Sequence, residues 1–100
     1  EASRVLAQRI LLEAGPQPED CIRLGFELAL SRPPNAGELA ELRSLYERQL
    51  AVYQADGEAA EKLVTFGESP RDADLPLDQH AAMTCVASVL LNLDETISKE

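Results

Sequence analysis

Apolar residues that recur every three or four positions, interrupted by proline and glycine, constrain this chain most. Near the C-terminal end, a 3-4-3-4 spacing joins Met83, Val86, Leu90, Leu93 and Ile97. This spacing places all five on one stripe of an α-helix, because about 3.6 residues complete one turn. A β-strand needs apolar residues at alternate positions instead, and no segment shows that alternation. The sequence therefore predicts an all-α fold.

Proline and glycine mark the ends of the first two predicted helices. The first is expected from about residue 3 to residue 14, because Gly15 and Pro16 follow it. The second begins at Pro18, since proline suits the first turn of a helix, and it ends before Pro33, which cannot continue one. Apolar residues surround most of the second helix, so we expect it to be the most buried.

Three further helices complete the predicted fold. Asn35 and Glu38 have the spacing of a capping box, which predicts the start of a long third helix that reaches about residue 56. A short fourth helix ends at Gly67, and a fifth begins at Leu77 or Asp78. With 100 residues, 45% of them hydrophobic, the chain can bury one core. We therefore expect one all-α domain over residues 1–100, a compact bundle of four to five helices.

The balance of charge limits the kinds of partner. Nine basic against 18 acidic residues give a net charge of −9, which disfavours binding to a phosphate backbone. No apolar run approaches the ~20 residues that a membrane-spanning helix needs. We therefore expect neither nucleic-acid binding nor membrane insertion. The chain begins without Met, and we interpret it as a C-terminal fragment of a larger multidomain protein.

No pattern typical of catalysis occurs in the sequence. His80 is the only histidine. Any catalytic or metal site that needs more than one histidine is therefore excluded within this chain. The serines lie in no GxSxG or SxxK setting, and no glycine-rich phosphate loop is present. We therefore predict no catalytic residue and no cofactor within residues 1–100.

An acidic loop precedes the fifth predicted helix. Asp72, Asp74 and Asp78 lie close to His80 in the sequence, and Ca²⁺ prefers carboxylate oxygens from such loops. The loop lacks the glycine and the final glutamate of an EF-hand. One interpretation is a weak cation or ligand site within residues 68–80. The preferred interpretation is a solvated loop that caps the fifth helix, with His80 near water.

Two other sets of side chains are interpreted as structural. The only cysteines, Cys21 and Cys85, are expected to be small buried residues, or a disulfide if the protein is exported. In the last predicted helix, three polar residues lie beside the apolar stripe: Asn92, Asp94 and Glu95. Acidic residues near a helix C-terminus oppose the helix dipole, so we interpret the three as a polar clasp that hydrogen-bonds a neighbouring loop.

Three stretches of the chain resemble one protein family. Residues 22–49 contain the run ALSRPPN followed by EL, residues 66–84 read FGESPRDADLPLDQHAAMT, and residues 86–100 read VASVLLNLDETISKE. Together they resemble the C-terminal part of the planctomycete-specific domain of unknown function (domain of unknown function fifteen fifty-three). The resemblance covers most of the 100 residues.

The resemblance implies a setting and no established activity. Such domains end large exported proteins that often carry a cytochrome-c-like haem domain, which implies a periplasmic or cell-envelope location and haem in upstream domains only. The expected partners are upstream domains of the same chain, or another protein. Our first hypothesis is therefore a non-catalytic structural or interaction module.

Two alternatives remain beside that hypothesis. In the first, Asn92, Asp94 or Glu95 contributes to an active site that an upstream oxidoreductase or hydrolase domain completes. In the second, the acidic loop of residues 68–80 binds a cation or another ligand.

Overall fold

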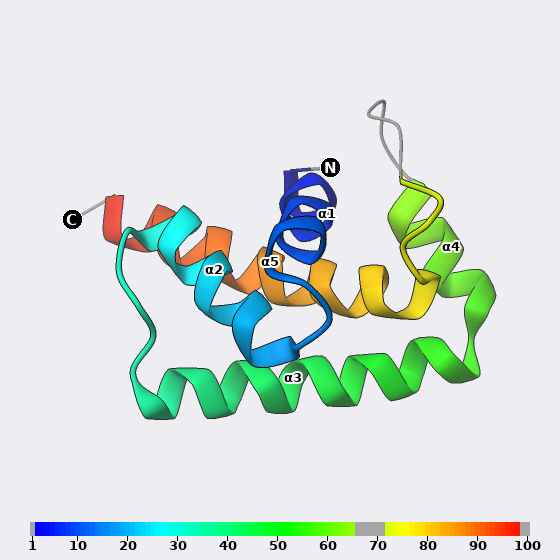
Figure 1. Cartoon of the computed structure of the whole chain (residues 1–100), viewed down its shortest axis with the longest axis horizontal. Coiled ribbons are helices and arrows are strands. Elements are labelled where there is room, and N and C mark those ends of the chain that lie inside the picture. The colour runs from blue at the N-terminus through cyan, green and yellow to red at the C-terminus, as the bar shows by residue number, and fades with distance from the viewer. Residues whose placement is uncertain (1, 66–71, 99–100) are drawn as a thin grey trace.

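A computed structural model of the chain describes residues 2–65 and 72–98, with the backbone alone for residues 94–98 (Figure 1). Within these residues it contains no strand and five helices: α1 (Ala2–Ala14), α2 (Pro18–Leu30), α3 (Ala36–Ala55), α4 (Gly57–Thr65) and α5 (Leu77–Ser98). The all-α bundle predicted from the apolar spacing is therefore confirmed. None of the described helices is long and apolar enough to cross a membrane.

α5 is the central helix of the bundle. It contacts all four other helices, with α3 below it and α1 above it in the view of Figure 1, where α2 crosses it. Its fully buried apolar side chains are Ala81, Ala82, Met83, Val86, Ala87 and Leu90. The expectation that the second helix is the most buried is wrong, because α2 packs on one side of the bundle while α5 lies at its centre.

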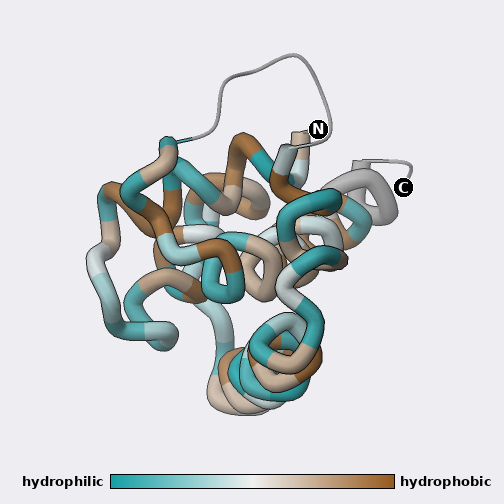
Figure 2. The backbone as a smooth tube through the Cα atoms, turned by 90° about the vertical axis from the view of Figure 1, so that its right-hand side faces the viewer, coloured by the Kyte–Doolittle hydropathy of each residue, from teal (hydrophilic) through white to brown (hydrophobic). Residues whose placement is uncertain are grey.

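The buried stripe of α5 is shorter than its apolar spacing predicts. Met83, Val86 and Leu90 are fully buried, but Leu93 is 39% exposed, and the side chain of Ile97 lies outside the described residues. Hydrophobic and hydrophilic segments are mixed along the tube in Figure 2, as expected for helices with one buried face. Such a pattern identifies the side of a helix that faces the core. It does not say where along the helix the neighbouring elements end.

Gly25 of α2 faces Leu90 of α5 and Ile10 of α1 at short distance. A Cβ atom added at this position would lie 2.8 Å from Leu90 Cδ1 and 3.0 Å from Ile10 Cδ1. Carbon atoms in contact are normally about 3.5–4.0 Å apart, so a larger residue needs its neighbours to move. The absence of a side chain at Gly25 therefore sets the close approach of these three helices.

The corner between α2 and α3 is built from local polar contacts. Ser31 ends α2 in the left-handed conformation, with φ of 59°, and its N–H donates to the carbonyl oxygen of Glu27. Asn35 Oδ1 then accepts from the N–H of Glu38 at 2.8 Å, while the Asn35 N–H donates to Glu38 Oε1 at 3.0 Å. These reciprocal bonds confirm the predicted capping box at the start of α3.

Candidate functional site

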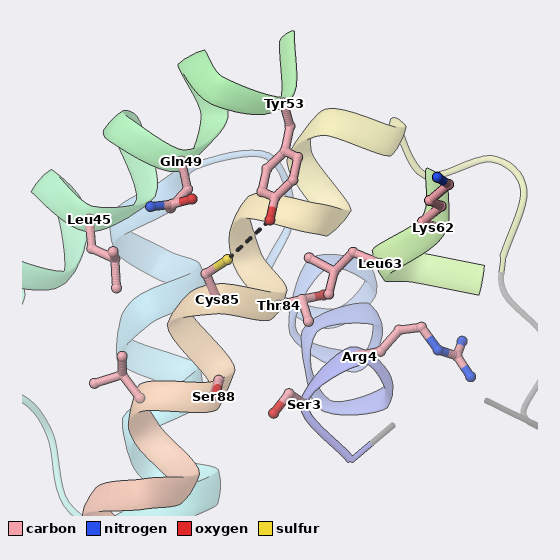
Figure 3. Close-up of a pocket in the computed structure, with 11 residues that line it drawn as sticks. Ser3, Arg4, Leu45, Gln49, Tyr53, Lys62, Leu63, Thr84, Cys85 and Ser88 are labelled. Carbon is pink, nitrogen blue, oxygen red and sulfur yellow. Dashed lines mark hydrogen bonds between the residues drawn. The ribbon is translucent and has the colours of Figure 1, made fainter. Parts of the chain in front are cut away.

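A cleft of about 690 Å³ lies between α1, α3, α4 and α5 (Figure 3). Helical spacing brings its residues together, because α3 contributes side chains four positions apart, which face the same way. The floor comes from two consecutive turns of α5. The lining residues are Ser3 and Arg4 of α1, Leu45, Gln49 and Tyr53 of α3, Lys62 and Leu63 of α4, and Thr84, Cys85, Ser88 and Val89 of α5.

Tyr53 and Cys85 connect α3 to α5 across the cleft. The Tyr53 hydroxyl lies 3.8 Å from Cys85 Sγ, a weak polar contact in which either atom can donate (Figure 3). Burial raises the pKa of the Tyr53 phenol, and the contact with Cys85 raises it further. The phenol therefore stays protonated and uncharged at neutral pH, and it contributes a partly buried surface to the cleft.

The charged side chains that line the described cleft are both cationic. Arg4 is only 2% exposed, whereas the side chain of Lys62 is 78% exposed and its Nζ lies 3.6 Å from Glu58 Oε1. In Figure 3 these two residues lie on the α1 and α4 side, opposite Leu45 of α3. Both residues border the cleft on this side, and in Figure 3 the guanidinium of Arg4 points away from the other labelled residues.

A buried polar connection behind the cleft joins α1 to α5. His80 Nε2 lies 3.1 Å from the carbonyl oxygen of Arg4, which fixes Nε2 as the donor because a carbonyl only accepts. The Thr84 hydroxyl in turn donates to the carbonyl oxygen of His80 at 2.7 Å. His80 is fully buried, so the expectation of a histidine near water is wrong. Its ring is turned into the bundle because α1 covers this turn of α5.

Two carboxylates of the acidic loop accept hydrogen bonds from backbone N–H groups close to them in the sequence. Asp72 Oδ1 accepts from the N–H of Asp74 at 2.9 Å, and Asp78 Oδ1 accepts from the N–H of Gln79 at 2.8 Å. No three histidine, cysteine, aspartate or glutamate residues come together as a metal site in residues 2–65 and 72–98. Asp72, Asp74, Asp78 and His80 are thus not assembled into a ligand set there. Part of the predicted loop, including Glu68, lies outside the described residues.

Cys21 and Cys85 are free thiols with different neighbours in the structure. Cys21 is buried and its Sγ lies 3.2 Å from the carbonyl oxygen of Gly15, whereas Cys85 Sγ faces Tyr53. Burial, with a smaller contribution from Asp20, raises the pKa of Cys21 to about 11. Cys21 is therefore buried as predicted, whereas Cys85 is only partly buried. The structure contains no disulfide bond between the two residues.

The predicted polar clasp is only partly visible. Asn92 is exposed on α5, while the side chains of Asp94 and Glu95 lie outside the described part of the chain. The clasp therefore stays a prediction.

Sequence reasoning missed the cleft and the burial of Arg4. For α3 the sequence did carry a signal, because Tyr46, Gln49 and Tyr53 follow a 3-4 spacing and so lie on one side of the helix. In the structure Tyr46 is buried, and Gln49 and Tyr53 line the cleft. For Arg4 there was no signal, since a single arginine in the first turn of a helix is usually exposed.

Comparisons with known proteins do not assign the chain to a family. The chain matches no known protein family, no curated protein and no solved structure.

Proposed function

We propose that the chain is a non-catalytic interaction module of a longer protein, and that it docks through the outer face of α1. The observation that carries the proposal is the exposure of two large apolar residues on that face. Val5 is 42% exposed and Leu12 is 54% exposed. They lie seven residues apart, which is close to two full turns, so both project from the same side of the helix. We call these two residues the α1 face.

The α1 face suits a protein neighbour better than water. Burial of an exposed valine or leucine side chain is worth ~1.5–3 kcal/mol when complete, and both residues here are about half exposed. Arg9 lies between them and forms an ion pair with Glu13, with Nε 2.6 Å from Oε2. Apolar anchors bordered by charged side chains are typical of interfaces between proteins or domains.

The resemblance of residues 22–49, 66–84 and 86–100 to the planctomycete-specific domain supports a particular neighbour. In that family the helical part follows other domains of an exported protein, so the surface that covers the α1 face would belong to an upstream domain. The proposed location is then the periplasm or cell envelope, and any haem would belong to that upstream part.

A double substitution tests the docking proposal. Val5→Glu with Leu12→Glu should leave the 100-residue chain folded, because both side chains already face solvent, and shift its melting temperature by only a few degrees. In the longer protein the same pair should loosen the domain and raise the rate of limited proteolysis at its junction several-fold. Val52→Glu is the matched control, since Val52 is also half exposed but lies on α3. An unchanged cleavage rate with the double variant would refute docking through α1.

A further inference from the structure

α4 packs through a small apolar cluster that is separate from the main core. Among the described residues, the main core is built from side chains of α1, α2, α3 and α5, and α4 contributes none. α4 instead buries Ala60 and Val64 against Ala81 of α5. Tyr53 and Leu63 pack against this second cluster and are only partly buried. Because two of the three buried side chains are alanines, the apolar surface that holds α4 in place is small.

The polar contacts of α4 stay within the helix and the residue that caps it. Thr65 Oγ1 donates to the carbonyl oxygen of Glu61 at 2.7 Å, and Lys62 Nζ lies 3.6 Å from Glu58 Oε1. No side chain of residues 57–65 forms a hydrogen bond or an ion pair with another of the described helices. Apolar packing therefore holds α4 against α5 without polar cross-links.

Asp56 joins α3 to α4 and completes the ends of both helices. Its N–H donates to the carbonyl oxygen of Val52 at 3.0 Å, in the last turn of α3. Its Oδ1 accepts from the N–H of Ala59 at 3.1 Å, and its carbonyl oxygen accepts from the N–H of Ala60 at 3.2 Å. Rotation about the N–Cα bond of Asp56 moves the side chain and the carbonyl group together with α4, so it breaks none of these bonds. Asp56 thus has the properties of a hinge.

α4 also forms one side of the cleft. In Figure 3, Leu45 of α3 and Leu63 of α4 lie on opposite sides of Cys85. Movement of α4 away from α5 would remove the wall that Lys62 and Leu63 form, and it would expose Ala81. The width of the cleft therefore depends on the position of α4.

We propose that α4 is a flap on the cleft, which rotates about Asp56 and leaves α5 while α1, α2, α3 and α5 stay packed. Proteins open locally in such units where few buried apolar contacts hold an element. α4 has nine residues, and isolated helices shorter than ~12–15 residues are marginal in water. Its amide hydrogens therefore exchange with solvent from the open form, without unfolding of the main core.

Hydrogen exchange of the ¹⁵N-labelled 100-residue chain tests the flap. The protection of each amide is measured by NMR at several urea concentrations below the unfolding transition. Residues 61–65 should be about a hundredfold less protected than residues 86–90 of α5, and their protection should hardly depend on urea, because little surface is exposed when α4 opens. Equal protection and equal urea dependence of the two sets would overturn the proposal, since α4 would then open only with the whole domain.

Two matched variants separate the opening of α4 from unfolding of the whole domain. Ile22→Val removes one methylene from a fully buried residue of the main core, and it should lower the protection of residues 86–90 about two- to tenfold. The protection of residues 61–65 should stay unchanged in this variant, because the main core is packed in both the closed and the open form. Val64→Ala weakens only the closed form, so it should lower the protection of both sets about tenfold. A fall of the same size at residues 61–65 in Ile22→Val would contradict the flap.

The flap and the α1 face share no residue. Failure of the exchange experiment would therefore leave the docking proposal standing, and the docking test does not depend on the movement of α4.

Discussion

Glu38 acts at the corner between α2 and α3 in two ways at once. It belongs to the capping box of α3, and its two carboxylate oxygens also accept from both terminal nitrogens of Arg32, at 2.8 and 2.7 Å. The guanidinium of Arg32 in turn lies 5.1 Å from the ring centre of Phe26, a cation–π contact with the core side of α2. A single carboxylate thereby connects the cap of one helix to the packing of the previous one.

The ionisation of Glu38 should make stability depend on pH in acid. The hydrogen bonds from Arg32, followed by that from the backbone of Asn35, lower the pKa of Glu38 from 4.5 to about 2. A carboxyl whose folded-state pKa is depressed stabilises the fold above its ordinary pKa, and this contribution is lost as the pH falls towards about 2. Glu38→Gln retains a capping side chain without the charge, so its melting temperature should lie below that of the parent at pH 7.

The pH profile of that difference is the test. The gap in melting temperature between the parent and Glu38→Gln should close between pH 4.5 and about 2. Glu41→Gln, at an exposed position one turn further along α3, should show no comparable gap. A gap that stays constant down to pH 2 would contradict the role given to the ionised carboxylate.

The two cysteines should differ in reactivity towards alkylating agents. At pH 8 the Cys21 thiol is buried and protonated, with a pKa raised to about 11, whereas the partly exposed Cys85 thiol lines the cleft. Iodoacetamide should therefore modify Cys85 well before Cys21, as mass spectrometry of the Cys21→Ser and Cys85→Ser variants can follow. Equal rates for the two single-cysteine proteins would show that the burial of Cys21 is wrong.

At the scale of the helices, the packing of α5 depends on how closely its neighbours approach. Gly25 of α2 packs closely against Leu90 and Ile10. Gly25→Val places a branched side chain there and should destabilise the fold by ~2 kcal/mol, in the usual range for an overpacked core. Gly25→Ala should stay within ~1 kcal/mol of the parent, because flexible side-chain ends can shift and alanine favours a helix over glycine.

Urea denaturation of the two Gly25 variants measures this contrast. A Gly25→Val protein as stable as Gly25→Ala would mean that the three helices are further apart than the structure places them.

Helix positions were largely predictable because their signals are local. Gly15, Pro18 and the Asn35 capping box act within one turn of chain, and each marks a helix end in the structure. The centrality of α5, the exposure of Leu93 and the burial of His80 were not predictable, because each depends on which distant helix covers a given turn. His80, for example, is buried by α1, 76 residues away in the sequence.

At the scale of the whole molecule, the cleft could not be predicted from the sequence either. Its walls come from four helices and span residues 3 to 89, so no single motif contains it. The sequence drew attention to charged loops, whereas the candidate sites in the structure are an apolar cleft and an apolar helix face. Small and aliphatic residues give no chemical signature until the fold brings them together.

The central claim is that the α1 face is covered by a neighbouring domain, and hydroxyl-radical footprinting tests it most directly. Oxidation rates of individual side chains are compared between the 100-residue chain and the proposed longer protein. We predict that the rates at Val5 and Leu12 fall several-fold in the longer protein, while the rate at Val52 is unchanged. Equal oxidation of Leu12 in the two proteins would contradict docking through α1.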